Sequence, residues 1–242
     1  MKKLIIFLSL FLITPHLFAQ VTINTTSNTL QQAPKTSNAV ELPSVKIGTQ
    51  IWTTQNLSVA RYRNGDIIPQ VTDPAQWAVL TTGAWCWYDN DSAKYGAKYG
   101  RLYNWYAVND ARGLAPQGYH IPSDAEWIKL LKYLDAAGAD TTYANLNQRS
   151  IPGSPIAGGA MKSSTGWNVP NTGATTSSGF AGLPGGYCYG TFKYIGILGY
   201  WWSSTEDNTT EAGYCALDYV DSTVFVLSGG KGVGFSVRCV RD

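Results

Sequence analysis

The clearest pattern of apolar and polar positions lies between residues 118 and 134. Apolar side chains recur there at the i, i+3, i+4 and i+7 positions that share one helix face: Trp127, Leu130, Leu131 and Leu134. Ser123 and Glu126 precede them with the spacing of a capping box, in which each side chain satisfies a backbone N–H at the helix start. The pattern therefore predicts a helix from Asp124 to about Ala136, with Gly138 as its stop.

Weaker signals precede and follow this helix. Residues 45–52 predict a strand, and Asp73 followed by Pro74 predicts a short helix. Residues 102–109 show a less regular helical spacing. Residues 138–199 are rich in Gly, Pro, Ser, Thr and Asn, and irregular segments of that length are often functional.

The C-terminal part alternates apolar and polar positions with the period of a strand. We expect strands at residues 214–219, 223–227 and 233–240. In the last of these the apolar side chains share one face, and Ser236 and Arg238 lie on the other. Helices followed by antiparallel strands indicate an α+β fold.

The N-terminus has the parts of an export signal. Two lysines are followed by an apolar stretch, residues 4–13, that is too short to span a bilayer, and Ala19 stands where signal peptidase cuts. We expect residues 1–19 to be a signal peptide rather than a membrane anchor, residues 20–44 to be a flexible polar leader, and residues 45–242 to form one domain. The mature chain is therefore predicted to be exported without a membrane span, to the periplasm, the cell surface or the medium.

Charge and histidine content limit the partners and the chemistry. The chain has 18 basic and 16 acidic residues, and removal of Lys2 and Lys3 with the signal leaves equal numbers of each. A neutral chain has no field that attracts phosphates, so nucleic acid is not an expected partner. His120 is the one histidine of the mature chain, which disfavours a zinc site or a hydrolytic triad. We expect it to make a structural hydrogen bond at the helix start.

The mature chain also has four cysteines, and none forms a Cys-x-x-Cys motif that would indicate a metal or redox centre. In an exported chain they are expected to form disulfides, and three pairings are open. The four are Cys86, Cys188, Cys215 and Cys239.

Several segments in order resemble one known family. They are Ile47–Trp52, Gln55–Leu57, Tyr62–Gly65, Tyr99–Val108, Gly118–Trp127, Tyr200–Glu206 and Gly234–Asp242. Together they resemble the Fibrobacter succinogenes major paralogous domain over residues 45–242, a family of exported and surface proteins without an established general activity. Its motifs are similar to those of the formylglycine-generating fold, a variant of the C-type-lectin-like architecture. The resemblance thus implies small helices around a twisted antiparallel sheet with long irregular loops.

The resemblance also bears on the cysteines. The family pattern often has cysteine at the positions of Cys86 and Cys239, which implies that these two pair and that Cys188 and Cys215 form a second disulfide. Formylglycine-generating oxygenases bind copper through reactive cysteines, but no closely spaced cysteine pair occurs here before the last strand. The catalytic residues of that family therefore do not transfer, and we expect no enzyme.

Acidic residues offer two further kinds of site. Glycoside hydrolysis needs two carboxylates at a defined separation, and the candidate acids are Asp89, Asp91, Glu206 and Asp207. Their spacing in the sequence fixes no two of them at that separation. Residues 89–91 place hard oxygen ligands together, but the later ligands and the glycine of an EF-hand are missing. We therefore predict no cofactor, with Ca²⁺ as the alternative.

Aromatic side chains are the remaining positive signal. Trp201 and Trp202 are adjacent, so on a strand they point to opposite faces, and at most one is buried if the sheet is covered on one side. Trp167 and Tyr189 lie in the polar stretch and are expected to be exposed. The predicted ligand contacts are Trp167, Tyr189, Trp201, Trp202, Glu206 and Asp207.

The sequence therefore predicts an exported, non-catalytic binding or adhesion module that recognises carbohydrate or another surface polymer. The contacts are expected in the loops of residues 140–200 and at the strand end of residues 201–207. The alternative is a structural subunit of a cell-surface assembly, in which the same loops contact a surface protein. A divergent oxygenase of the formylglycine-generating type is the third hypothesis.

Overall fold

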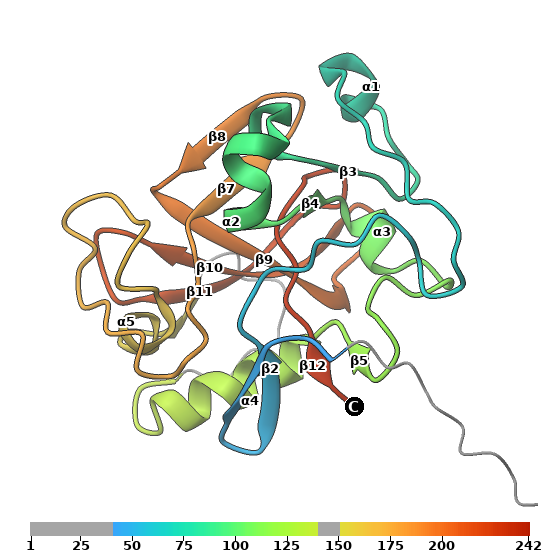
Figure 1. Cartoon of the computed structure of the whole chain (residues 1–242). Coiled ribbons are helices and arrows are strands. Elements are labelled where there is room, and N and C mark those ends of the chain that lie inside the picture. Colours follow the sequence, from blue (N-terminus) through green and yellow to red (C-terminus); the bar gives the residue numbers. More distant parts are fainter. Residues whose placement is uncertain (1–40, 140–150) are drawn as a thin grey trace, which may run out of the picture. The chain divides into compact units, whose positions relative to one another are not determined.

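The computed structural model describes residues 41–139 and 151–242 (Figure 1). The predicted signal peptide and nearly all of the predicted leader lie outside the described residues, as does the segment 140–150 of the predicted ligand-binding loops. The described part is mixed, with mostly strands and a few small helices, which is compatible with the α+β prediction. No helix in this part is long and apolar enough to cross a membrane.

The first sheet contains the beginning and the end of the described chain. Its strand order is β1 (Ser44–Ile47), β2 (Gln50–Thr53), β12 (Val240–Arg241) and β5 (Tyr119–His120), with antiparallel pairing throughout. Residues 45–52 were expected to form one strand and instead form a hairpin. The chain reverses at Gly48, whose φ of +60° is accessible to glycine and strained for other residues.

The second sheet is the largest and is also antiparallel. Its strand order is β6 (Ile151–Ser154), β11 (Val224–Gly230), β10 (Glu211–Asp218) and β9 (Leu198–Glu206). β10 and β11 confirm the strands predicted at residues 214–219 and 223–227, with shifted ends. β6 and the start of β9 lie in the stretch that was expected to be irregular.

Two short ladders complete the strands. They are β3 (Trp85–Cys86) with β4 (Leu102–Tyr103), and β7 (Gly185–Cys188) with β8 (Phe192–Ile195). The strand predicted at residues 233–240 is wrong for most of its length. Residues 234–236 instead make single bridges to three different segments: Gly234 to Cys188, Phe235 to Tyr103, and Ser236 to Trp201. Residues 234–240 are all buried, and they include Arg238, which was expected on a polar face and is fully buried.

α4 (Asp124–Leu134) confirms the main predicted helix, which ends two residues earlier than expected. The Glu126 carboxylate accepts hydrogen bonds from the backbone N–H and the hydroxyl of Ser123, each at 2.9 Å. The helix is thus fixed at its first turn by the predicted capping box. At its other end, the Asp135 carboxylate accepts from the N–H of Gly138 at 2.9 Å.

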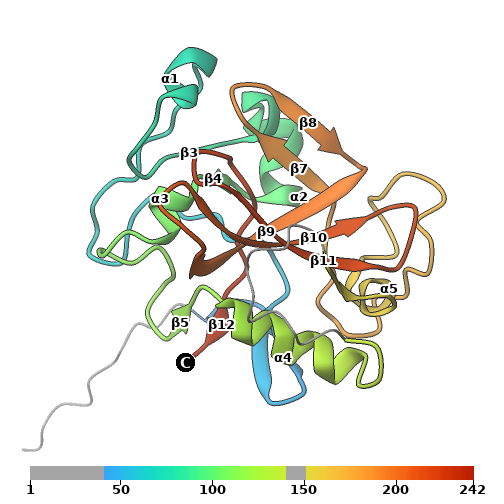
Figure 2. The ribbon, with the colours of Figure 1, turned by 180° about the vertical axis from the view of Figure 1, so that it is seen from behind.

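The remaining helices are short. α1 (Pro74–Ala78) confirms the predicted helix at Asp73, whose carboxylate accepts from the N–H of Gln76 at 2.8 Å. The others are a 3₁₀ turn (Tyr88–Asn90), a π-helical turn (Ser92–Gly96), α2 (Ala97–Tyr99), α3 (Trp105–Val108) and α5 (Ala157–Met161). Figures 1 and 2 both show α4 below the second sheet and the β7–β8 hairpin above it.

The second sheet separates two apolar clusters. Trp201 belongs to the cluster that α4 covers, in which the ring centroids of Trp52 and Trp127 are 4.7 Å apart. Trp202 belongs to the cluster on the other side, where its ring lies 4.5 Å from that of Phe235. Both Trp201 and Trp202 are 0% exposed, so the expectation that at most one is buried was wrong. The physical reason is that this sheet is covered on both faces at that point.

Candidate functional site

Four tyrosines gather on the face of the second sheet that carries Trp202. Tyr187 comes from β7, Tyr194 from β8, Tyr200 from β9 and Tyr214 from β10. We call these four residues the tyrosine surface. Large aromatic side chains with a polar tip are the residue type most often found at recognition sites, because one part packs and the other bonds to the ligand.

Strand alternation explains how the sequence brings these side chains to one face. Tyr200 and Trp202 are two residues apart in β9 and therefore project to the same side. Tyr214 lies directly opposite Trp202 across the β9–β10 pair. In the β7–β8 hairpin, Tyr187 lies opposite Lys193, and its ring contacts that of Tyr194.

The tyrosine surface is built on one buried ring, that of Phe235, which is 4% exposed. Tyr200 stacks on Phe235 with a centroid distance of 4.8 Å and an interplanar angle of 15°, and Tyr214 lies 4.9 Å from the same ring. Tyr187 contacts Tyr200 at 5.9 Å and Tyr194 at 5.6 Å in edge-on geometry. Rings fixed in this way lose little rotamer freedom when a ligand binds.

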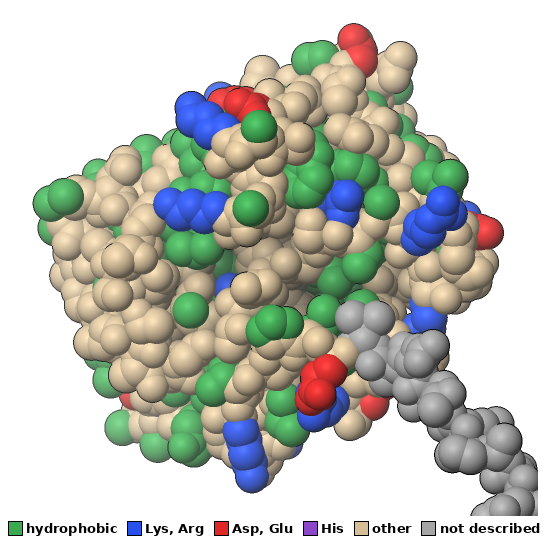
Figure 3. All heavy atoms as spheres, in the orientation of Figure 1, with side chains coloured by type: hydrophobic (Ala, Val, Ile, Leu, Met, Phe, Trp, Pro, Cys, Tyr) green, Lys and Arg blue, Asp and Glu red, His purple; other side chains and the backbone are tan. Residues whose placement is uncertain are grey.

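The hydroxyl groups of Tyr200 and Tyr214 are hydrogen-bond donors and acceptors that burial keeps neutral. Partial burial raises the pKa of Tyr200 and of Tyr214, because desolvation disfavours the phenolate. Tyr194 is 43% exposed, and the other three tyrosines are half-buried. On the face shown in Figure 3, charged side chains stand in small separate groups among uncharged surface. The four side chains of the tyrosine surface themselves offer ring faces for stacking and hydroxyl groups for hydrogen bonding.

Three of the predicted ligand contacts are core residues instead. Trp167 is 8% exposed, and Trp201 and Trp202 are fully buried. Their indole N–H groups are also satisfied internally: Trp167 donates to the Gly182 carbonyl and Trp201 to the Asn56 side chain, each at 2.9 Å. Trp167 was expected to be exposed because it lies in a polar stretch, and at least one of Trp201 and Trp202 was expected to be accessible, but tertiary packing covers all three.

The other three predicted contacts lie at the surface in two separate places. Tyr189 is 54% exposed in the turn between β7 and β8, as expected. Glu206 forms an ion pair with Lys231 and lies six residues along β9 from Tyr200, about 20 Å in an extended strand. The Asp207 N–H donates to the Glu211 carbonyl at 3.1 Å, in the turn that follows. The structure therefore does not gather the six predicted residues into one site.

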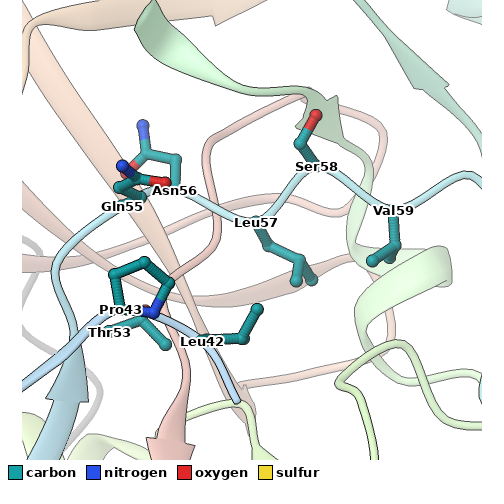
Figure 4. A pocket seen from close by; sticks show the side chains of 8 residues that line it. All are labelled: Leu42, Pro43, Thr53, Gln55, Asn56, Leu57, Ser58 and Val59. Carbon is teal, nitrogen blue, oxygen red and sulfur yellow. The ribbon is translucent and has the colours of Figure 1, made fainter. Parts of the chain in front are cut away.

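A hollow of about 190 Å³ lies beside the segment that follows β2 (Figure 4). Figure 4 shows the side chains of Leu42 and Leu57 turned toward one another, with those of Gln55 and Asn56 pointing away. Asn56 uses its amide in the fold: Oδ1 accepts from Arg238 at 2.7 Å and Nδ2 donates to the Tyr99 carbonyl at 2.8 Å. The hollow thus offers mainly apolar contact.

His120 makes the structural hydrogen bond that was expected at the start of α4. Its Nε2 lies 2.7 Å from Glu126 Oε1, and its Nδ1 lies 2.7 Å from Asp242 Oδ1. Partial burial opposes the charged imidazolium, but its hydrogen bonds to the two carboxylates outweigh that effect and raise the pKa of His120. Both ring nitrogens are thus engaged by carboxylates, which favour the protonated ring.

The four cysteines are buried thiols. The structure does not pair Cys86 with Cys239 or Cys188 with Cys215: Cys239 and Cys215 belong to the clusters on the two sides of the second sheet. Cys86 and Cys188 instead share a third cluster, where burial and then the Cys188 side chain raise the pKa of the Cys86 thiol. Chain order does not reveal this neighbour relation. It arises because Gly234 bridges to Cys188 of β7 and Phe235 bridges to Tyr103 of β4, which pairs with β3.

The acidic segment at residues 89–91 is used locally. Asp91 Oδ1 accepts from the Lys94 N–H at 2.9 Å, and Asn90 donates to the Thr72 carbonyl at 3.0 Å. Within residues 41–139 and 151–242, no three His, Cys, Asp or Glu side chains are grouped so that they could hold a metal ion.

The geometry defines a mixed domain of small helices and antiparallel sheets that presents an uncharged aromatic surface. The chain belongs to the Fibrobacter succinogenes major domain family, whose family model matches residues 45–241. This confirms the family resemblance over all but the last residue of the predicted domain. No curated protein and no solved structure matches the chain.

Proposed function

We propose that this protein is a non-catalytic binding module that recognises a polysaccharide through the tyrosine surface. The observation that carries the proposal is the set of four packed tyrosine rings: Tyr187, Tyr200 and Tyr214 contact Phe235, and Tyr194 contacts Tyr187. The proposal includes export, as the N-terminal pattern predicts, and a C-type-lectin-like architecture for the domain.

The chemistry of the tyrosine surface fits a sugar polymer. The apolar face of a pyranose ring stacks on an aromatic ring, and its hydroxyl groups bond to neutral donors and acceptors at the ring edge. Tyr187 and Tyr194 come from one hairpin and Tyr200 and Tyr214 from neighbouring strands, so successive sugar units can meet successive rings. The balanced charge of the predicted mature chain is compatible with an uncharged polymer.

Two features support a role without catalysis. His120 is held between two carboxylates and has no nitrogen free to accept a proton. Burial raises the pKa of the Cys86, Cys215 and Cys239 thiols, which disfavours the thiolate that nucleophilic or metal chemistry requires.

The test uses a panel of neutral and acidic polysaccharides, with binding measured by tryptophan fluorescence and by calorimetry. We expect Tyr194→Ala to weaken binding of the best polysaccharide about five- to tenfold, since one aromatic contact contributes about 1 kcal/mol beyond its buried area. Tyr200→Phe keeps the ring on Phe235 and removes only the hydroxyl, so it separates stacking from hydrogen bonding.

Tyr133→Ala is the matched control, because Tyr133 is 64% exposed on α4, outside the tyrosine surface. It is expected to leave the affinity unchanged. No response of the wild-type protein to any polysaccharide, or equal affinities of the Tyr194→Ala variant and the wild type, would contradict the proposal.

A further inference from the structure

Cys86 and Cys188 are adjacent in a small apolar cluster between β3 and β7. Cys86 is 0% exposed and Cys188 is 3% exposed, and the cluster also contains Trp77, Tyr88 and Leu102. Burial and, after it, the neighbouring Cys188 side chain raise the pKa of the Cys86 thiol. Two cysteines of one buried cluster can form a disulfide if their Cβ atoms come within about 4 Å of each other.

The backbone on both sides of this pair is fixed. Cys86 lies opposite Leu102 in the β3–β4 ladder. Cys188 exchanges two hydrogen bonds with Gly234, its N–H donating at 3.1 Å and its carbonyl accepting at 2.7 Å. The backbone thus holds both cysteines in one buried cluster, whereas Cys215 and Cys239 belong to two other clusters.

We propose that Cys86 and Cys188 form a disulfide while the chain folds in an oxidising compartment, and that this bond fastens the β7–β8 hairpin to β3. The hairpin carries Tyr187, Tyr189 and Tyr194, so the bond also fixes one side of the tyrosine surface. Cys215 and Cys239 remain thiols.

The oxidant is a low-molecular-weight disulfide such as oxidised glutathione. The thiolate of one cysteine attacks a sulfur of oxidised glutathione, forming a mixed disulfide and releasing one glutathione thiol. The second cysteine loses its proton and attacks the mixed disulfide, which forms the protein disulfide and releases the second glutathione. The protein loses two protons and two electrons in total. Because only the thiolate attacks and burial raises the pKa of the Cys86 thiol, this thiol reacts while the cluster is still open.

The test refolds the reduced, denatured full-length chain with reduced and oxidised glutathione. We expect two of the four thiols to remain when they are counted in denaturant, and the non-reduced digest to contain one cross-linked pair of peptides, with Cys86 joined to Cys188. Four remaining thiols, or Cys86 joined to Cys215 or Cys239, would overturn the proposal.

Variants and proteolysis test the mechanical role of the bond. Cys86→Ala is expected to leave three thiols after the same refolding, whereas Cys215→Ala is expected to leave one thiol and the same cross-linked pair. In the wild type, oxidation should slow tryptic cleavage after the exposed Lys193 of β8 about tenfold and leave cleavage after Lys132 of α4 unchanged. Equal rates after Lys193 in both redox states would refute the fastening role. Because none of these readouts needs a ligand, they are independent of polysaccharide binding.

Discussion

At the scale of single residues, Lys162 shows how a buried charge is used in this fold. Its side chain is fully buried, and its ammonium donates to three carbonyls: those of Thr172 at 2.8 Å, Asp218 at 2.9 Å and Asp221 at 2.6 Å. Two of the acceptors lie at the end of β10 and in the turn that follows, and the third lies in the loop after α5. The ammonium therefore reinforces the contact between these two segments, which the Thr172 N–H also makes by donating to the Tyr219 carbonyl at 2.9 Å.

Replacement of Lys162 by methionine is predicted to destabilise the protein by about 3 kcal/mol, since three carbonyls lose a charged donor. The measurement is the free energy of unfolding in urea. Lys193→Met is the matched control, because Lys193 is exposed on β8, and it is expected to change this free energy by less than about 0.5 kcal/mol. If Lys162→Met also lowered the free energy of unfolding by less than about 0.5 kcal/mol, water would be able to replace the ammonium as the donor to the three carbonyls.

His120 gives the stability a dependence on pH. Its pKa is raised in the folded protein, so its contribution is present in full below the ordinary histidine pKa and is lost as the pH rises through the folded pKa. Partial burial disfavours the Glu126 carboxylate, but the hydrogen bonds from Ser123 and His120 outweigh it and lower its pKa. The contribution of the Glu126 carboxylate to the free energy of unfolding is therefore lost only as the pH falls through its lowered pKa.

We therefore predict that His120→Gln destabilises the protein most near pH 5 to 6 and progressively less toward pH 8. Urea unfolding of the wild type and the variant across this range measures the difference. Because the side chain of His120 is 39% exposed, 1 M salt is expected to reduce the effect. A difference that grows with pH would contradict the assignment of His120 as a cation held by two carboxylates.

At the scale of elements, α4 is the helix whose start is most clearly determined by its own sequence, through Ser123 and Glu126. At pH 8, where the contribution of His120 is small, Glu126→Ala is predicted to destabilise the protein by about 1 kcal/mol, because the Ser123 N–H loses its acceptor. Glu126→Gln keeps an oxygen at that position and should lose less than half as much. Lys129→Ala, on the exposed side of the same helix, controls for helix propensity. Equal losses in both Glu126 variants would exclude capping as the cause.

The elements that the sequence predicts correctly are those whose signals are local. The capping box of Ser123 and Glu126 and the cap at Asp73 each depend on residues within one helical turn. The alternation of apolar and polar residues that begins at Tyr214 is also a local signal, so β10 could be predicted from the sequence. The β1–β2 hairpin was missed because Gly48 and Thr49 lie inside residues 45–52, a stretch of strand-forming residues that has the length of one strand.

The site was less predictable, because it depends on which faces of the strands are covered. Strand alternation places Trp201 and Trp202 on opposite faces of the sheet, but it does not show that each face is covered by an apolar cluster. The available signal for the tyrosine surface was the placement of Tyr200 two residues before Trp202, but its exposure depends on where Phe235 and Tyr187 dock. The contact between Cys86 and Cys188 likewise arises only when residues 234–236 thread between strands.

At the scale of the whole domain, Asn56 and Arg238 join its distant parts. Asn56 Oδ1 accepts from Arg238 Nε at 2.7 Å and from the Trp201 indole at 2.9 Å. The Arg238 guanidinium also donates to the carbonyls of Thr53 at 2.6 Å and Phe180 at 2.8 Å. Burial lowers the pKa of Arg238 because it disfavours the charged guanidinium, and the hydrogen bonds to these acceptors stabilise that charge. The pair thus connects both sheets and the loop at Phe180.

A double-mutant cycle is predicted to show that Asn56 and Arg238 act as one unit. Asn56→Ala leaves two buried donors unpaired and should cost about 3 kcal/mol, and Arg238→Met leaves carbonyls unpaired and should cost a similar amount. Because both variants break the same Asn56–Arg238 bond, the double variant should lose about 1 to 2 kcal/mol less than the sum. Asn56→Ala combined with Lys193→Met should be additive within about 0.5 kcal/mol. Additivity of the first pair, measured by urea unfolding, would mean that the two side chains stabilise their neighbours independently.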